Sequence, residues 1–227
     1  MSVENNEIRQ IVIVEDHPVY RMGLKTLLNE EPDLAVCADV GDGPEALTIL
    51  RTTQCDGVIV DVCLPGIDGL ELTKHIRAEH PEMCILVVSM HDESIYALRA
   101  LRAGARGYVT KDKNPEVIVG ALRKALDGEI AVSPDLGNDL IYKVVHGDGM
   151  SENPIDSLTD RELEILRLVG QGYATQQIAE ALHLSVKTVE SHRLHTKEKL
   201  GLKSAGELVR FAMNWYDEQV GLARSRP

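Results

Sequence analysis

Five short runs of apolar residues, each followed by a segment in which apolar residues recur at helical spacing, occupy most of residues 8–128. The runs are rich in Val and Ile and are continuous, which is typical of strands buried on both faces of a parallel sheet. This alternation predicts an α/β fold, a five-stranded, parallel, doubly wound domain. The predicted strands are 9–14, 34–40, 57–61, 83–89 and 106–110; the predicted helices are 19–30, 43–51, 68–79, 93–103 and a fifth capped by Asn114, with Val117 and Ile118 facing inward.

Polar side chains stand at the ends of four of these predicted strands. Because open α/β sheets bind ligands at the carboxyl ends of their strands, we expect these side chains to converge on one edge. Clustered carboxylates repel one another unless a cation lies among them, and hard oxygen ligands with room for water suit Mg²⁺. The residues are Glu15 and Asp16 after the first strand, Asp61 at the end of the third, Ser89 at the end of the fourth, and Lys111, which follows Tyr108 in the fifth.

This set of side chains suits phosphoryl transfer to Asp61. An aspartate carboxylate can carry a phosphoryl group covalently, and Mg²⁺, Lys111 and the Ser89 hydroxyl can each compensate one phosphoryl oxygen. Taken singly, each residue has a simpler interpretation, since an acid at a strand end often caps a helix and a lysine is usually solvated. The combination, in order along the chain, favours a phosphoacceptor site at Asp61.

The charge of the 227-residue chain is unevenly distributed. Of the net −12, residues 1–150 carry −11 (14 basic and 25 acidic residues) and residues 151–227 carry −1 (10 and 11). The acidic part is not expected to bind nucleic acid by itself. No apolar run approaches the roughly 20 residues of a membrane span, and the first residues lack an apolar signal core. We therefore expect a cytoplasmic protein with no membrane partner, and its four cysteines, which lack zinc spacing, are expected to be reduced thiols.

Residues 158–214 predict a second, all-α unit. A capping box at Thr159-x-x-Glu162 opens its first helix, a short helix covers 175–183, and a longer one begins after Ser185 and runs to about Leu200. Two short helices, a tight turn and a longer helix predict a helix-turn-helix. Ser204 is expected to cap a last helix whose inward residues are Leu208, Val209, Ala212 and Met213. The stretch 129–157 is expected to be a linker with one helix, carried by Leu136, Leu140, Ile141, Val144 and Val145.

The longer helix of this pair has two different faces. Helical spacing turns Val189, His192, Thr196 and Leu200 inward and leaves a polar face outward. A basic surplus on a helix that would enter the major groove predicts contacts to DNA phosphates, although a solvated basic face on a packing helix has the same composition. The candidate phosphate contacts are Lys187, Lys197, Lys199 and Lys203, and the candidate base contacts are Glu190, Ser191 and Leu194, with Thr188 and His195 beside them.

Two families are recognisable in these motifs. The segments Val14-Glu15-Asp16-His17, Ile59 to Gly69, Val88-Ser89 and Gly107 to Lys111 resemble the receiver domain of bacterial two-component response regulators. Four further segments resemble the LuxR-type helix-turn-helix, namely 158–166, Ile178-Ala179, Ser185 to His192 and 199–201. Together they resemble the NarL/FixJ class, with a receiver domain at 1–128, the linker at 129–157 and a DNA-binding domain at 158–227.

The resemblance implies a function for each site residue. Asp61 would accept a phosphoryl group from a sensor histidine kinase, Lys111 would contact the phosphate, and Ser89 and Tyr108 would be the switch pair. The implied Mg²⁺ ligands are Glu15, Asp16, Asp61 and the backbone carbonyl of Cys63.

The expected protein is thus a phosphorylation-controlled transcription factor and not an enzyme. Its expected partners are double-stranded DNA, the kinase, a second copy of the chain when phosphorylated, and, as a further candidate, RNA polymerase. A receiver that acts by docking on a protein partner, or a regulator that binds DNA independently of phosphorylation, is the alternative.

Overall fold

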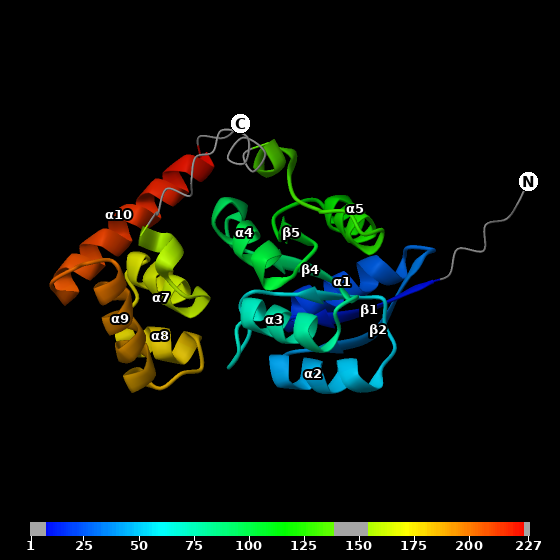
Figure 1. The fold of residues 1–227 in the computed structure, drawn as a ribbon, viewed down its shortest axis with the longest axis horizontal. Helices are drawn as coiled ribbons and strands as arrows, with labels where there is room; N and C mark the ends of the chain where they lie inside the picture. The colour runs from blue at the N-terminus through cyan, green and yellow to red at the C-terminus, as the bar shows by residue number, and fades with distance from the viewer. Residues whose placement is uncertain (1–7, 139–153, 225–227) are drawn as a thin grey trace, which may run out of the picture. The chain divides into compact units, whose positions relative to one another are not determined.

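The computed structural model describes residues 8–138 and 154–224 (Figure 1). The chain forms two compact units, Met1–His146 and Gly147–Pro227, which divide within the linker predicted from the sequence. Each unit is described by itself. Residues 134–138, at the start of the predicted linker helix, are helical. Its other predicted apolar positions, Leu140, Ile141, Val144 and Val145, lie outside the described residues.

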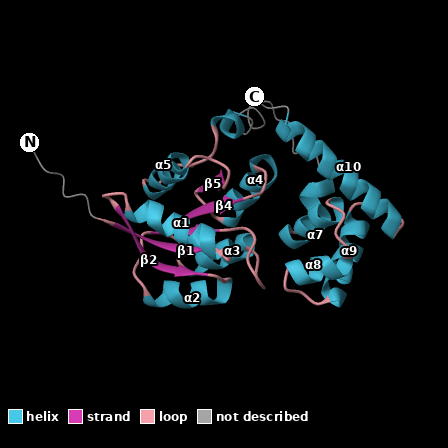
Figure 2. Ribbon diagram, turned by 180° about the vertical axis from the view of Figure 1, so that it is seen from behind, coloured by secondary structure: helices cyan, strands magenta, loops and turns pink. Residues whose placement is uncertain are grey.

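A five-stranded sheet with every pairing parallel is the centre of the first unit, as the sequence predicted (Figure 2). The order of its strands is β2-β1-β3-β4-β5. Because neighbouring strands are parallel, each connection crosses over the sheet through a helix. The register pairs Val14 with Val60 and Val60 with Val87, so β1 and β3 end level with one another and β4 extends two residues further, to Ser89. The bounds are β1 Arg9–Val14, β2 Leu34–Val40, β3 Gly57–Val60, β4 Cys84–Ser89 and β5 Gly107–Thr110.

Helices cover both faces of this sheet. Helices α1 and α5 pack on one face, where Leu28 and Leu122 lie fully buried in one core with Ile59 and Leu86 of the sheet. Helices α2, α3 and α4 cover the other face (Figure 2). The helices are α1 Pro18–Asn29, α2 Gly43–Thr52, α3 Gly69–Glu79, α4 Glu93–Ala103 and α5 Pro115–Leu126.

Side-chain caps fix where most of these helices begin. His17, Asp42, Asp68 and Asp92 each accept a hydrogen bond from an amide in the first turn of the helix that follows. Asn114 occupies the capping position of α5 but makes no such bond, so the prediction of a capping side chain there was wrong. Pro115 explains the difference, because its ring presets the helical φ and leaves one fewer amide to satisfy.

The second unit is a small helical bundle. Thr159 and Glu162 form the predicted capping box of α7, and Ser185 accepts a hydrogen bond from the Thr188 amide at the start of α9. The core contains Leu163, Ile178, Val189, Leu208 and Ala212, all nearly inaccessible to solvent. The elements are a 3₁₀ turn at Pro154–Ser157, α7 Asp160–Gly170, α8 Thr175–Ala181, α9 Val186–Lys199 and α10 Ala205–Arg224.

Three further details of the predicted helices were wrong. Helix α8 ends at Ala181 and not at 183, because His183 has a left-handed φ of 52° that no helix continues. Val117 and Met213, predicted to face inward, are 48% and 46% exposed. Each lies one residue, about 100° around its helix, from a residue that faces the core, which is Ile118 or Ala212.

No helix among the described residues has both the length and the apolar composition required to cross a membrane.

Candidate functional site

The carboxyl edge of the sheet brings together the acidic residues predicted from the sequence. Asp61 follows β3 and Glu15 follows β1, and both are almost completely buried, whereas Asp16 is exposed. Carboxylate oxygens of the three residues lie within 4.8 Å of one another. Gly69 packs directly against the backbone of Asp61 in the turn after β3. A Cβ at position 69 would lie 1.8 Å from the Asp61 carbonyl oxygen, so only glycine fits.

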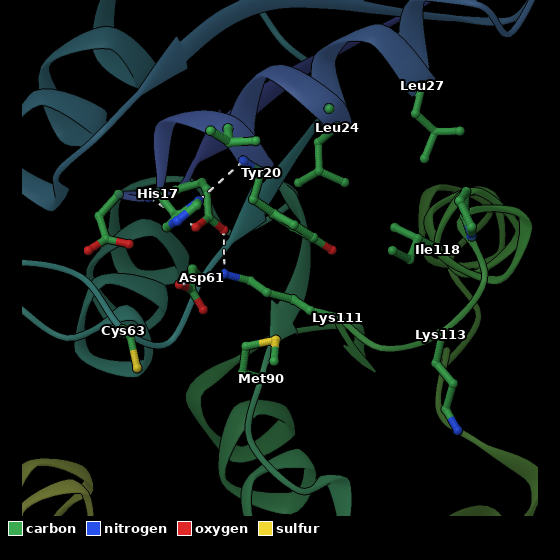
Figure 3. A pocket seen from close by; sticks show the side chains of 15 residues that line it. His17, Tyr20, Leu24, Leu27, Asp61, Cys63, Met90, Lys111, Lys113 and Ile118 are labelled. Atoms are coloured by element: carbon green, nitrogen blue, oxygen red, sulfur yellow. Dashed lines mark hydrogen bonds and ion pairs between the residues drawn. The ribbon is translucent and has the colours of Figure 1, made fainter. Parts of the chain in front are cut away.

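Lys111 reaches into this acidic cluster from the end of β5 (Figure 3). Its Nζ donates to Glu15 Oε2 at 2.6 Å and to Asp61 Oδ2 at 2.8 Å. The same ammonium lies 4.7 Å from the ring centroid of Tyr20, a cation–π contact that the sequence analysis did not anticipate. Lys111 is therefore the counter-ion that allows two carboxylates to be buried side by side.

Burial and charge oppose each other in this cluster. Burial raises the pKa of Asp61, and Lys111 and then the Cys63 backbone amide only partly offset the effect. The pKa of Glu15 is raised by burial and then by the Asp61 charge. For Lys111, burial lowers the pKa, but Asp61 and Glu15 together outweigh it and the net shift is upward. The ammonium is thus firmly charged, while both carboxyl groups have a reason to take up a further cation.

The donor set fits a divalent cation. Asp61 Oδ1 is buried and has no hydrogen-bond partner among the described residues, although the other oxygen of the same carboxylate is held by Lys111. Such an unsatisfied carboxylate oxygen is costly unless a cation or donor reaches it. The exposed Asp16 stands beside it, and Cys63, whose backbone carbonyl is the fourth predicted ligand, lines the same cavity. Oxygen ligands of this kind suit Mg²⁺.

The predicted switch pair lies behind the cluster. Ser89 and Tyr108 are both buried, and Tyr108 Oη donates to the carbonyl oxygen of His91 at 2.9 Å. The His91 amide in turn donates to Ser89 Oγ at 3.4 Å, and its ring stacks on Tyr96 of α4 at 4.4 Å between centroids. Sequence reasoning missed His91, because a lone histidine two residues after a strand gives no signal of its own.

On the second unit, the outward face of α9 is as predicted from helical spacing. Lys187, Glu190, Ser191, Leu194 and His195 are exposed, with Leu194 47% exposed. Of the residues predicted to face inward, Val189 and Thr196 are buried, whereas His192 and Leu200 are only half-buried. Thr188 is half-buried and its Oγ1 lies 2.7 Å from Ser185 Oγ, so this candidate contact is also part of the cap.

Two basic residues of α9 are already engaged. Lys199 Nζ donates to Glu162 Oε2 of α7 at 2.7 Å, and Arg193 donates to Thr175 Oγ1 of α8 at 2.6 Å. For Lys187, Lys197 and Lys203, no side-chain hydrogen bond or ion pair is found within the parts of the chain that the structure describes. Helix α9 therefore offers two uncommitted lysines, Lys187 and Lys197, and Lys203 lies just beyond its end.

Comparison with known families gives two matches. Residues 11–123 match the response regulator receiver domain, and residues 156–212 match the bacterial regulatory proteins of the luxR family. The oxygen regulatory protein NreC of Staphylococcus haemolyticus (strain JCSC1435) is 41% identical over 209 residues, which are 90% of this chain and 96% of that protein. NreC of Staphylococcus carnosus (strain TM300) is 38% identical over the same shares.

Solved structures agree with these matches. A LuxR-family two-component response regulator from Aurantimonas sp. SI85-9A1 is 40% identical, with a TM-score of 0.57 over 61% of this chain and 99% of that one. RcsB from Salmonella enterica serovar Typhimurium, bound to promoter P1flhDC in the presence of phosphomimetic BeF3⁻, is 26% identical, with a TM-score of 0.60 over 92% and 98%.

Proposed function

Because the chain belongs to the NarL/FixJ class of two-component response regulators, phosphorylation-controlled transcription regulators that bind DNA, we propose that Asp61 is its phosphoacceptor and α9 its recognition helix. The observation that carries the first assignment is the asymmetry of the Asp61 carboxylate. One of its oxygens is held by Lys111, and the other is buried and unsatisfied beside Glu15 and Asp16. A nucleophile presented in this way is oriented before any donor arrives.

In the reaction, an oxygen of Asp61 forms a bond to phosphorus while the bond from phosphorus to a histidine nitrogen of the sensor kinase breaks. Mg²⁺, when bound by Glu15, Asp16, Asp61 and the Cys63 carbonyl, supplies positive charge beside the transferring group. Lys111 Nζ, already 2.8 Å from Asp61, then neutralises a phosphoryl oxygen, and Ser89 Oγ lies at the end of the neighbouring strand to donate to another.

The contacts behind the site give phosphorylation a route to a helix. If Ser89 Oγ turns to the phosphoryl group, its contact with the His91 amide changes. The His91 carbonyl holds Tyr108, and the His91 ring stacks on Tyr96, so the start of α4 responds with it. We infer that this change promotes dimerisation or releases the DNA-binding unit, in the manner of a two-state element biased by local charge.

On the second unit, we infer that Lys187, Lys197 and Lys203 contact DNA phosphates and that Glu190, Ser191 and Leu194 face base edges in the major groove. Glu190 accepts from a cytosine amino group in this arrangement, and Leu194 suits a thymine methyl group. A dimer would read two half-sites. RNA polymerase is a further candidate partner, and action on chromosomal DNA would place the protein in the cytoplasm. We propose no enzymatic activity beyond the receiver's own phosphorylation.

The test combines the two units in one measurement. The full chain is incubated with Mg²⁺ and a small phosphodonor, phosphate incorporation is measured by intact mass, and DNA selected from a random pool is footprinted before and after. We expect one phosphoryl group on the wild type, none on Asp61→Asn, and DNA affinity that rises with phosphorylation only in the wild type. Retained labelling of Asp61→Asn would mean that the acceptor is misassigned. Equal footprints in all samples would favour DNA binding without phosphate control.

A further inference from the structure

The cavity that contains Asp61 continues well beyond the acidic cluster. It has a volume of about 710 Å³ and runs from Glu15, Asp16 and Asp61 into a space between α1 and α5. Beyond Lys111 its wall becomes mostly apolar, with Lys113 beside Ile118 at the far end (Figure 3). The side chains that form this part are Tyr20, Leu24, Leu27 and Ile118. Volume and lining are those of a small-molecule site, which is mostly apolar with a small number of polar groups.

One feature of α1 leaves this apolar extension open. Gly23 lies in the middle of the helix and lines the cavity, and a Cβ at that position would meet no atom within 4 Å. Glycine inside a helix is unfavourable relative to alanine, and here no close packing requires it. Tyr20, whose ring lies against the Lys111 ammonium, forms part of the wall of the same space. The open space at Gly23 indicates room that the protein itself does not fill.

The position of the cavity restricts what can occupy it. Since Asp61 opens into this cavity, a small donor that delivers a phosphoryl group to Asp61 must leave its remaining atoms there or at the mouth. The polar end, with Lys111 and the predicted Mg²⁺ ligands, suits the phosphoryl group, and the apolar end suits a hydrocarbon chain attached to it. An acyl phosphate with an apolar acyl chain combines both parts in one molecule.

We propose that the groove between α1 and α5 binds the acyl chain of acyl phosphate donors, so that the receiver prefers donors with chains longer than acetyl. The inference rests on the proposed function of Asp61. In the transfer, a carboxylate oxygen of Asp61 forms a bond to phosphorus while the bond from phosphorus to the acyl oxygen breaks. The electron pair of the broken bond leaves on the acyl carboxylate, and no oxidant or additional proton is needed.

The size of the preference follows from apolar burial. Each methylene group moved from water to an apolar wall favours binding by about fourfold. Butyryl phosphate carries two methylenes more than acetyl phosphate, so full burial gives about 15-fold and partial burial about fivefold. The leaving carboxylates, acetate and butyrate, have nearly the same basicity. A difference in rate between the two donors therefore reports on the chain and not on the intrinsic reactivity of the acyl phosphate.

The first experiment uses the wild-type full chain with Mg²⁺. Second-order rate constants of phosphate incorporation are measured with acetyl, propionyl and butyryl phosphate, and with phosphoramidate as a donor that has no carbon chain. We expect the rate constant to rise from acetyl to butyryl phosphate by about 5- to 15-fold. Equal rate constants for the three acyl phosphates would overturn the inference while leaving Asp61 as the acceptor. Absence of incorporation from every donor would instead overturn the proposed function.

A matched pair of variants then locates the effect. Gly23→Leu places a side chain in the groove, whereas Gly120→Leu places the same side chain on α5 at a position that also has open space within 4 Å but does not line the cavity. We expect the butyryl-to-acetyl ratio to fall towards 1 in Gly23→Leu and to keep its wild-type value in Gly120→Leu. An unchanged ratio in Gly23→Leu would overturn the inference. So would slower transfer from a phosphorylated kinase alone, because the groove would then serve the kinase. If Gly23→Leu does not fold, the wild-type donor series decides the question.

Discussion

Charged side chains are buried and paired at the acidic edge of the first unit, whereas on the outward face of α9 they are mostly exposed and, among the described residues, unpaired. At the sheet edge, Glu15, Asp61 and Lys111 are all nearly excluded from water and bind one another directly. On α9 the charged side chains are mostly exposed, and Lys187 has no partner within the described part of the chain. Buried charges must pair, so the order of the strands is enough to predict which charged side chains form ion pairs at the sheet edge. Exposed charges are solvated, and neighbouring helices decide which of them is free.

The strongest challenge to this contrast is to remove the buried cation. In Lys111→Met, two buried carboxylates face each other without compensation. We expect phosphate incorporation to fall about 100-fold or more, because a preorganised charge at the reacting group is lost, and the free energy of unfolding to fall by about 3 kcal/mol. Chemical denaturation and a phosphorylation time course measure the two effects.

The control for this variant is Lys124→Met, which removes an exposed lysine of α5. Its free energy of unfolding should stay within about 0.5 kcal/mol of the wild type. Added Mg²⁺ should stabilise Lys111→Met more than the wild type, since the metal takes over the neutralisation of Glu15 and Asp61. Wild-type rates of incorporation in Lys111→Met would show that the ammonium is only a structural counter-ion.

The second prediction concerns base readout by the exposed face. Glu190 is exposed and has no side-chain hydrogen bond or ion pair within the described ranges, so its carboxylate is free to meet a base. Glu190→Gln should change the preferred base at one position of each half-site from cytosine to adenine, by about 10- to 100-fold in relative affinity. Selection from randomised operators measures this. An identical preferred sequence for both proteins would mean that Glu190 is merely solvated.

Much of the first unit could be predicted because its pattern is redundant. Each strand is continuous and apolar, and the polar residue at its end can lie only at the carboxyl edge, so Glu15, Asp61 and Lys111 were expected together. The contacts that depend on side-chain direction were harder to predict. The orientations of Val117 and Met213 were wrong by a fraction of a helical turn, and no pattern in the sequence indicated that Tyr20 would cover Lys111.

In the second unit, spacing predicted the exposed and buried faces of α9 but not the pairing of its lysines. Lys199 was grouped with Lys187 as a phosphate contact, because both are basic residues of one helix. The partner of Lys199 is Glu162, which lies 37 residues away on α7 and becomes available only when the helices pack. Whether Lys199 also reaches DNA stays a prediction, and its ion pair argues against a contribution equal to that of Lys187.

That difference gives the third prediction, a comparison of two lysines of the same helix. Lys187→Ala should flatten the slope of log affinity against log salt concentration by about one unit, as expected for one lost phosphate contact. Lys199→Ala should leave the slope nearly unchanged, because its ammonium is held by Glu162. Binding titrations at several salt concentrations separate the two. Equal losses of slope would show that Lys199 exchanges Glu162 for phosphate when DNA binds.

The smallest expected effect lies in the pH dependence of that same ion pair. Burial alone raises the pKa of Glu162, but Lys199 and Thr159, which donate to its carboxylate at 2.7 and 2.8 Å, outweigh burial and lower the pKa below its ordinary value of 4.5. The folded state therefore favours the charged form. The stabilisation is fully present above about pH 4.5, the ordinary value, and is lost as the pH falls through the lower pKa of the folded protein.

Glu162→Gln isolates this contribution, because glutamine still accepts the Thr159 amide in a capping box but cannot pair with Lys199. We expect the variant to be about 1 kcal/mol less stable than the wild type at pH 7, since Lys199 is partly exposed. The difference should shrink towards zero in increasingly acidic buffers. Glu198→Gln is the matched control, an exposed acid of α9 whose replacement removes the same charge without an ion pair, and its stability should follow that of the wild type. If the stability difference between Glu162→Gln and the wild type stayed constant with pH, the contact with Lys199 would act through packing and not through charge. The exposed and buried charges of this protein would then differ less in their energetic effect than their geometry indicates.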